Sequence, residues 1–181
     1  MEIIQYEPKY KEDVRRICIN TGSPEKKTNK EHYNFSLMMY CDPYIDHETA
    51  FLILDDESKV RGYILCATNY DHFETVMKPY IDKIKTDCPN FANRTDISNY
   101  AKYKENYPAH LHIDIEESYT GNHHGTKLMQ TLIQYLEANH IKGVMLGVDK
   151  ANKRAVSFYS KMGFKVLEET EFGATLGLKL D

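Results

Sequence analysis

Apolar and polar residues alternate over residues 109–116, which predicts a strand with two different faces. One face carries Leu111, Ile113 and Ile115, and the other carries His110, His112, Asp114 and Glu116. Glu116 ends the alternation, and we expect it to be exposed. Shorter apolar runs predict further strands at residues 3–6, 50–54, 60–67, 143–148, 164–168 and 174–180. The polar residues 55–59 between two of these runs are typical of a hairpin turn.

Apolar residues spaced three and four positions apart predict helices between the strands. The clearest helix covers residues 126–140, where one side collects Leu128, Met129, Leu132, Ile133 and Leu136. Further helices are predicted at residues 10–20, 29–41, 72–85 and 152–162. This order indicates an α/β fold, with a central mixed sheet that has helices on both faces.

Residues 68–108 are the least regular part of the chain, and many tyrosines lie among their polar residues. So long an excursion is uncommon in a compact domain and is often functional. The other interpretation is a surface insertion that packs its own aromatic side chains. Without internal repeats or a clear boundary, we expect residues 1–181 to form a single domain, with an extended insertion at about 68–108.

The composition is that of an ordinary globular protein, with 181 residues, 41% of them hydrophobic and 28% charged. A net charge of -4 without a basic block argues against nucleic acid as a partner. The four cysteines lie far apart and favour reduced thiols. The chain begins without a signal-peptide pattern, and no apolar stretch approaches the ~20 residues of a membrane helix. We therefore expect a cytoplasmic protein with no membrane partner.

Two glycines, Gly121 and Gly125, flank a short polar segment directly before the predicted helix at 126–140. Free backbone N–H groups and the helix dipole make such a position suitable for phosphate oxygens, although two glycines also simply shape turns. The spacing fits neither a nucleotide P-loop nor a dinucleotide fingerprint.

The segment from Asn152 to Phe164 makes this loop more informative, because it reads Asn-x-x-Ala-x-x-Phe-Tyr-x-x-x-Gly-Phe. Together, the loop and this segment resemble the GNAT superfamily of acetyltransferases, whose central sheet is splayed where acetyl-CoA enters. More narrowly, residues 107–115 resemble the branch related to the acetyltransferase-like domain of O-GlcNAc hydrolases. The resemblance is strong over about 107–164, is looser over 1–67, and does not cover 68–106.

The resemblance implies a role for particular residues. Ile113 and Ile115 would offer backbone groups to the pantetheine arm, and Asn152 would touch that arm. Tyr159 would act as general acid and protonate the departing thiolate, unless it is simply a buried aromatic residue. Main-chain N–H groups would hold the pyrophosphate at Gly121, Asn122, His123, His124, Gly125 and Thr126.

The sequence departs from the family pattern within the loop. Thr120 stands where Gln or Arg is usual, His123 where glycine is usual, and Glu117 where proline is common. A residue other than glycine at position 123 requires permissive backbone angles. These departures bear on the affinity for the cofactor more than on the fold.

An amine must lose a proton to attack a thioester, so a nearby base would help. Asp114 is the first candidate and His112 the second, and the other interpretation is that neighbouring elements satisfy both. The His-x-His pattern with Asp114 also allows a zinc site, but no companion ligand pattern supports one. Cys66 lies inside a strand, which does not favour a catalytic cysteine.

These inferences predict an acetyl-CoA-dependent N-acetyltransferase, with acetyl-CoA as co-substrate and no metal. The acceptor would be a small amine, an amino sugar or a peptide amine, and residues 68–108 could cover its pocket. The resemblance also leaves a homodimer open. The alternative function is a catalytically inactive GNAT-fold module that binds a ligand or a protein.

Overall fold

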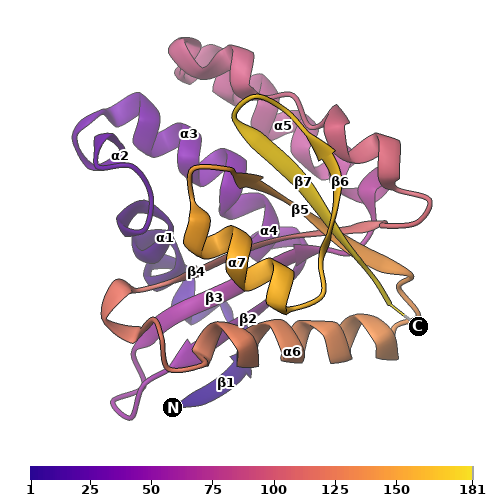
Figure 1. The fold of residues 1–181 in the computed structure, drawn as a ribbon. Coiled ribbons are helices and arrows are strands. Elements are labelled where there is room, and N and C mark those ends of the chain that lie inside the picture. The colour runs from indigo at the N-terminus through magenta and orange to yellow at the C-terminus, as the bar shows by residue number, and fades with distance from the viewer. Residues whose placement is uncertain (181) are drawn as a thin grey trace.

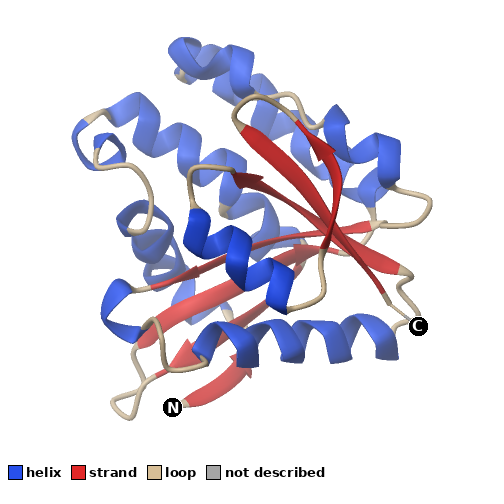
Figure 2. Ribbon diagram, viewed as in Figure 1, coloured by secondary structure: helices blue, strands red, loops and turns tan. Residues whose placement is uncertain are grey.

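The computed structural model describes residues 1–180, in which a seven-stranded sheet lies between two layers of helices (Figures 1 and 2). The strand order is β1-β2-β3-β4-β5-β7-β6, and every neighbouring pair is antiparallel except β4 and β5. The strands are β1 (Glu2–Gln5), β2 (Thr49–Leu54), β3 (Val60–Ala67), β4 (Ala109–Ile115), β5 (Gly143–Asp149), β6 (Lys165–Glu169) and β7 (Gly173–Lys179). The predicted mixed sheet with helices on both faces is confirmed.

The helices correspond closely to the sequence pattern, with two additions. The α-helices are α1 (Lys11–Asn20), α2 (Glu25–Thr28), α3 (Lys30–Tyr40), α4 (Asp42–His47), α5 (Tyr70–Asp87), α6 (His124–Ala138) and α7 (Lys153–Lys161). Short 3₁₀ helices occur at Pro8–Tyr10, Pro89–Arg94, Ser98–Tyr103 and Glu117–Tyr119. The sequence did not predict α2 and α4, because helices of four and six residues are too short to show a hydrophobic period.

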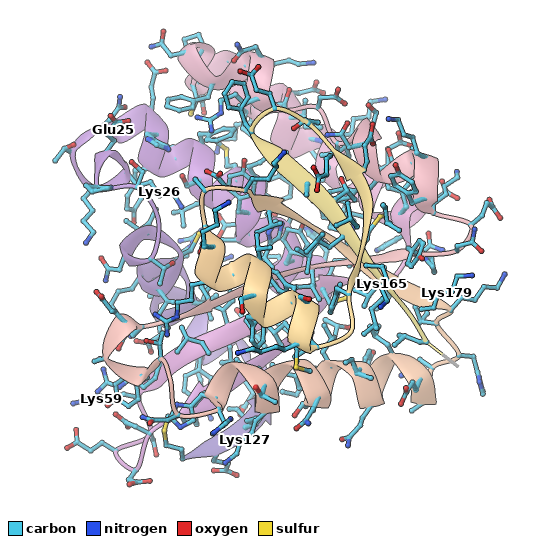
Figure 3. The ribbon with its side chains drawn as sticks, viewed as in Figure 1. Glu25, Lys26, Lys59, Lys127, Lys165 and Lys179 are labelled. Carbon is cyan, nitrogen blue, oxygen red and sulfur yellow. The ribbon has the colours of Figure 1, made fainter. Side chains whose placement is uncertain are left out.

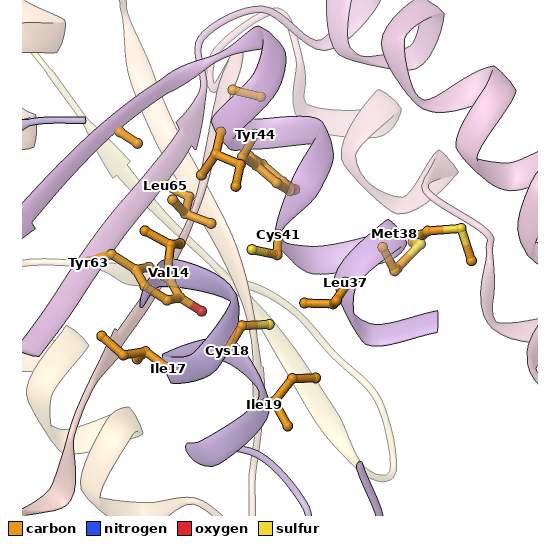
Figure 4. Close-up of a cluster of buried hydrophobic side chains, with 14 of the residues drawn as sticks. Val14, Ile17, Cys18, Ile19, Leu37, Met38, Cys41, Tyr44, Tyr63 and Leu65 are labelled. Carbon is orange, nitrogen blue, oxygen red and sulfur yellow. The ribbon is translucent and has the colours of Figure 1, made fainter. Parts of the chain in front are cut away.

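Both faces of the sheet are buried, so the central strands carry continuous apolar runs. In β2, Leu52 and Leu54 face one core, whereas Phe51 and Ile53 face the other. The first core packs the sheet against α1, α3, α4 and α5, and the second packs it against α6 and α7. Figure 4 shows part of the first core, which includes Tyr44 and Tyr63.

Residues 68–108 are not a surface insertion that packs only its own aromatic residues. The α5 side chains Phe73, Met77 and Ile84 are almost completely buried in the first core, where Cys88 and Ile97 join them. The predicted helix at 72–85 is confirmed and extends by two residues at each end. The segment was hard to interpret because its apolar positions are spread over one long helix and two 3₁₀ helices.

The two halves of the sheet part between β4 and β5. These strands pair only at Ala109 with Val144 and at His110 with Met145, within the described chain. Beyond His110, β4 continues alongside β3, whereas β5 continues alongside β7. The predicted splay is therefore present, and it leaves one backbone edge of β4 unpaired.

The start of β5 is fixed by a close approach of backbone segments at Gly143. A Cβ atom on Gly143 would lie 2.5 Å from the carbonyl oxygen of Asn106 and 3.0 Å from that of Leu178. Only a residue without a side chain fits there, because backbone atoms can give way little.

We predict that Gly143→Ala lowers the free energy of unfolding by about 2–4 kcal/mol, since backbone must move. Gly147→Ala is the matched control on the same strand, because its Cβ would meet only the Tyr100 hydroxyl, at 3.6 Å. Thermal and denaturant unfolding of both variants measures the difference. Equal stability of the two variants would contradict the proposed constraint at Gly143.

Candidate active site

A cleft of about 1370 Å³ opens where the two halves of the sheet part. One wall is β4 from Ile113 onward, and a second is the loop that leads into α6. The third wall is α7 with the preceding Asn152, and residues 20–22 at the end of α1 complete the lining. Every residue that the resemblance assigned to acetyl-CoA, except Asn122, lines this cleft.

The β4 wall offers unpaired backbone. Ile113 and Ile115 are half-buried, and their side chains pack against the second core. Because β5 has already diverged, the strand edge that faces the cleft is free to pair with another extended group. This is the arrangement that the resemblance implied for these two residues.

The loop before α6 ends in a left-handed residue. Gly121 has φ +88°, and His123 has φ 60° and ψ 10°. The position where the sequence departs from glycine thus does need permissive backbone angles, and histidine adopts them. His124 Nδ1 lies 2.8 Å from the Tyr119 carbonyl, to which it donates, and this bond ties the loop to the helix start.

The first turn of α6 has free backbone donors. The helix begins at His124, two residues earlier than the sequence pattern predicted, and the Lys127 N–H bonds the His123 carbonyl at 3.0 Å. The N–H groups of His124, Gly125 and Thr126 precede that bond, and the His123 side chain caps none of them. Together with the helix dipole, they form a site suited to phosphate oxygens.

Asn152 and Tyr159 are both positioned by α7. Asn152 is the N-cap, and its side-chain oxygen accepts a hydrogen bond from the Ala155 N–H at 3.0 Å. Tyr159 is 8% exposed and packs edge-on against Phe158 and Phe164. Burial, and to a lesser extent the charge of Asp114, raise the pKa of Tyr159, so its hydroxyl keeps its proton at neutral pH.

Asp114 faces the same cleft from β4 and is held by a neighbouring strand. Its Oδ2 atom accepts a hydrogen bond of 2.6 Å from the hydroxyl of Tyr63, its cross-strand partner on β3. Burial raises the pKa of Asp114, and this outweighs the lowering effects of Tyr63, Thr21 and the Lys26 ammonium. Asp114 is therefore a stronger base than an exposed aspartate. Lys26 lies on α2, near the end of α1 (Figure 3).

His112 is placed differently from Asp114, although both lie on the same face of β4. The Tyr44 hydroxyl lies 2.7 Å from His110 Nε2 and 3.0 Å from His112 Nε2. One hydroxyl can donate to one of these nitrogens and accept from the other. The buried His110 Nδ1 has no partner. An unpaired lone pair there costs less than an unpaired N–H, so His110 donates to Tyr44, which donates to His112.

This arrangement limits His112 as a base. Burial, with a smaller contribution from Lys26, lowers the pKa of His112 to about 4, and burial lowers that of His110 well below its usual range. Both rings are neutral at neutral pH, and the Nε2 lone pair of His112 is occupied by Tyr44. Within residues 1–180, no three His, Cys, Asp or Glu side chains group as metal ligands would.

Three residues near the cleft were missed or misread from the sequence. Arg154 is an exposed cation in the cleft wall. Tyr63 orients Asp114. The expectation that Glu116 is exposed is wrong, because it is half-buried and forms ion pairs with Arg16 and Arg61. The contacts of Asp114 and Glu116 join residues that lie far apart in the sequence, so no local pattern predicts them.

Comparison with known proteins identifies the family. The sequence model of the Acetyltransferase (GNAT) family matches residues 17–164, which is most of the chain. The chain belongs to the GNAT acetyltransferase family. Membership implies acyltransferase activity, and the matched residues contain the whole loop, β4, β5 and α7. None of the described helices of this family member is long and apolar enough to cross a membrane.

Solved structures show the same fold over nearly the whole chain. The crystal structure of SsHAT is 22% identical with a TM-score of 0.78, and the alignment covers 98% of this chain and 97% of that one. A GNAT-family acetyltransferase from Staphylococcus aureus Mu50 is 16% identical, with a TM-score of 0.63 and 99% coverage of both chains. Aminoglycoside 6'-acetyltransferase type Ii is 16% identical, with a TM-score of 0.64 and coverage of 99% and 97%.

The buried histidines predict how stability depends on pH. Their folded pKa values lie below the ordinary value of 6.5, so they bind fewer protons folded than unfolded. Stability is therefore complete above about pH 6.5 and is lost as the pH falls toward about 4. We expect the free energy of unfolding to fall by about 2–4 kcal/mol between about pH 7 and pH 5.

Denaturant unfolding across this pH range checks the prediction. His112→Gln should reduce the pH dependence, because an amide can accept the Tyr44 hydrogen bond and does not titrate. The exposed His140 provides the control, as His140→Gln should leave the dependence unchanged. Identical pH profiles for all three proteins would refute the assignment of this pH dependence to the buried pair.

Asp114 predicts an effect of the opposite sign. The pKa of Asp114 is higher in the folded chain than its ordinary value of 3.8, so the folded chain binds more protons there than the unfolded chain does. The ionisation of Asp114 therefore lowers the free energy of unfolding as the pH rises above about 4. Asp114→Asn should therefore raise the melting temperature at neutral pH by about 2–4 °C, the shift that about 1 kcal/mol gives at this size. The gain should vanish below about pH 4, and a lower melting temperature at neutral pH would contradict it.

Proposed function

We propose that this chain is an acetyl-CoA-dependent N-acetyltransferase that transfers the acetyl group to a primary amine by direct attack. The single observation that carries the proposal is that one cleft joins three features. They are the free N–H groups at the start of α6, the unpaired edge of β4, and the Tyr159 and Asp114 side chains. Phosphates, an extended amide arm and a thioester are all parts of acetyl-CoA, and each of them has a matching wall.

The order of the features along the cleft also fits the co-substrate. The α6 loop lies beside the outer end of β4, since a Cβ on Gly125 would lie 3.5 Å from Ile115 and from Phe158. The pyrophosphate would bind at residues 121–126, with Arg154 near the phosphates. The arm would then pair along Ile113 and Ile115, past Asn152, and the thioester would lie near Tyr159.

The chemistry follows from the two perturbed side chains. Asp114 accepts a proton from the bound ammonium, and the neutral nitrogen attacks the thioester carbonyl. A C–N bond forms and the C–S bond breaks, while Tyr159 donates its proton to the departing sulfur. The acylated nitrogen then releases its second proton to solvent and becomes a neutral amide. Solvent then takes the proton from Asp114 and returns one to Tyr159. Holding both reactants in one cleft lowers the entropic part of the barrier.

The acceptor class in this proposal is a primary amine, whether on a small molecule, an amino sugar or a peptide. The assignment of residues 107–115 to the branch that resembles the acetyltransferase-like domain of O-GlcNAc hydrolases stays a prediction. A GNAT-fold module that binds acetyl-CoA or another ligand without transfer is the alternative that the experiments below separate.

Isothermal titration with acetyl-CoA tests the binding half of the proposal. We expect a dissociation constant of about 1–100 µM, equivalent to about 5–8 kcal/mol. Gly125→Trp should abolish this binding, because an indole would fill the space against Ile115 and Phe158. Gly125→Ala is the matched control and should bind like the wild type, since its Cβ makes only ordinary 3.5 Å contacts. Absence of binding at millimolar acetyl-CoA would overturn the proposal.

Steady-state kinetics with a panel of amines test the chemical half. Tyr159→Phe should lower kcat by about 100-fold with little change in the KM for acetyl-CoA, because only the proton donor is lost. In the wild type, kcat/KM should fall as the pH falls through the raised pKa of Asp114, and Asp114→Asn should remove that limb. Tight acetyl-CoA binding without transfer to any amine would favour the binding module.

A further inference from the structure

A second cavity lies at the point where β4 and β5 part. Its volume is about 160 Å³, and its walls include His112 of β4 and Gly147 of β5. We infer that the acceptor is a primary amine joined by a short linker to one ring-sized, largely apolar group, and that this cavity binds the ring-sized group. The inference rests on the proposed function and narrows its acceptor class.

The position of the cavity relative to Asp114 suits an acceptor. His112 and Asp114 are two residues apart on the same face of β4, so their Cα atoms lie about 6.6 Å apart. His112 lines the small cavity, and Asp114 lines the large cleft. A ring beside His112 and an amine beside Asp114 would be separated by about the length of a two-carbon linker.

Tyr100 connects the cavity to the vertex of the sheet. Its ring stacks on His110 with centroids 4.5 Å apart, and its hydroxyl would lie 3.6 Å from a Cβ on Gly147. It therefore contacts both strands where they separate. The predicted role of residues 68–108 as a cover for the acceptor pocket is consistent with this position, because Phe73 and Tyr100 both line the cavity.

The lining favours an apolar ring over a hydroxylated sugar. The inner walls are the aromatic side chains of Tyr44, Phe73, Tyr100 and His112, and the His112 ring is neutral at neutral pH. A cavity of roughly 150 Å³ is large enough for benzene. The Tyr44 hydroxyl and His112 Nε2 are already paired with each other, and Asn99 and Thr175 are the uncharged, non-aromatic polar residues of the lining. A hexosamine would therefore bury several hydroxyl groups with few partners, which is unfavourable.

The charges of the lining also argue against a strongly charged group in the cavity. The charged residues of the lining are Arg94 and Asp96, which are both exposed and of opposite sign. Because both side chains are exposed, a second charged group beside them would remain in water. The buried part of the cavity therefore favours apolar surface.

The test compares 2-phenylethylamine, glucosamine and a lysine-containing peptide as acceptors for the full chain with acetyl-CoA, by mass spectrometry of the products. We expect kcat/KM for 2-phenylethylamine to exceed the other two by at least about 10-fold, the effect of about 1.4 kcal/mol. Gly147→Val should raise its KM by a similar factor and leave acetyl-CoA affinity unchanged, because Gly147 does not line the large cleft. Val148→Ile is the control, since Val148 packs against the second core.

Direct titration with 2-phenylethylamine separates this inference from the proposed function. We expect binding to the wild type, with a shift of the His112 imidazole resonance in NMR, and weaker binding to Gly147→Val. If glucosamine or the peptide is the better acceptor, the inference is wrong and the acetyltransferase proposal stands. If acetyl-CoA fails to bind while the amine still binds in this cavity, the proposed function fails instead. Absence of amine binding by both methods overturns the inference.

Discussion

The separation of β4 from β5 after only two residue pairs is the constraint on which the site depends. A fully paired sheet would satisfy the β4 backbone and leave no room between its halves. Here Tyr100 packs at the vertex on one face, and the backbone beyond His110 has an open edge. The large cleft, the small cavity and the free strand edge all arise from this one departure from regular pairing.

Around the vertex, the fold buries polar groups that a purely structural core would avoid. The Asp114 carboxylate accepts a hydrogen bond from Tyr63, and the two histidines share hydrogen bonds with one hydroxyl, that of Tyr44. Burial works against the charged form of each group, so the aspartate becomes a better base and the histidines stay neutral. The first core therefore holds the side chains of the site in place, at some cost in stability.

The loop before α6 shows how a departure from a family pattern can be accommodated. A glycine was expected at position 123, but histidine takes the left-handed backbone conformation there, and the adjacent His124 anchors the loop through the Tyr119 carbonyl. The backbone donors at the helix start remain unpaired by the cap. The suitability of the loop for phosphate oxygens is therefore a property of its main chain, which tolerates a change of side chain.

The order of elements, the two faces of β4, the loop and the motif of α7 could be read from the residues alone, because hydrophobic period and glycine placement are local signals. It also identified Asp114 and Tyr159 as candidates, through alternation and through the family motif. The folded chain was needed to show that the Tyr44 hydroxyl is hydrogen-bonded to His112, that Arg16 and Arg61 form ion pairs with Glu116, and that residues between 70 and 97 join the first core. Those contacts join segments distant in the chain, and no local pattern encodes which of them meet.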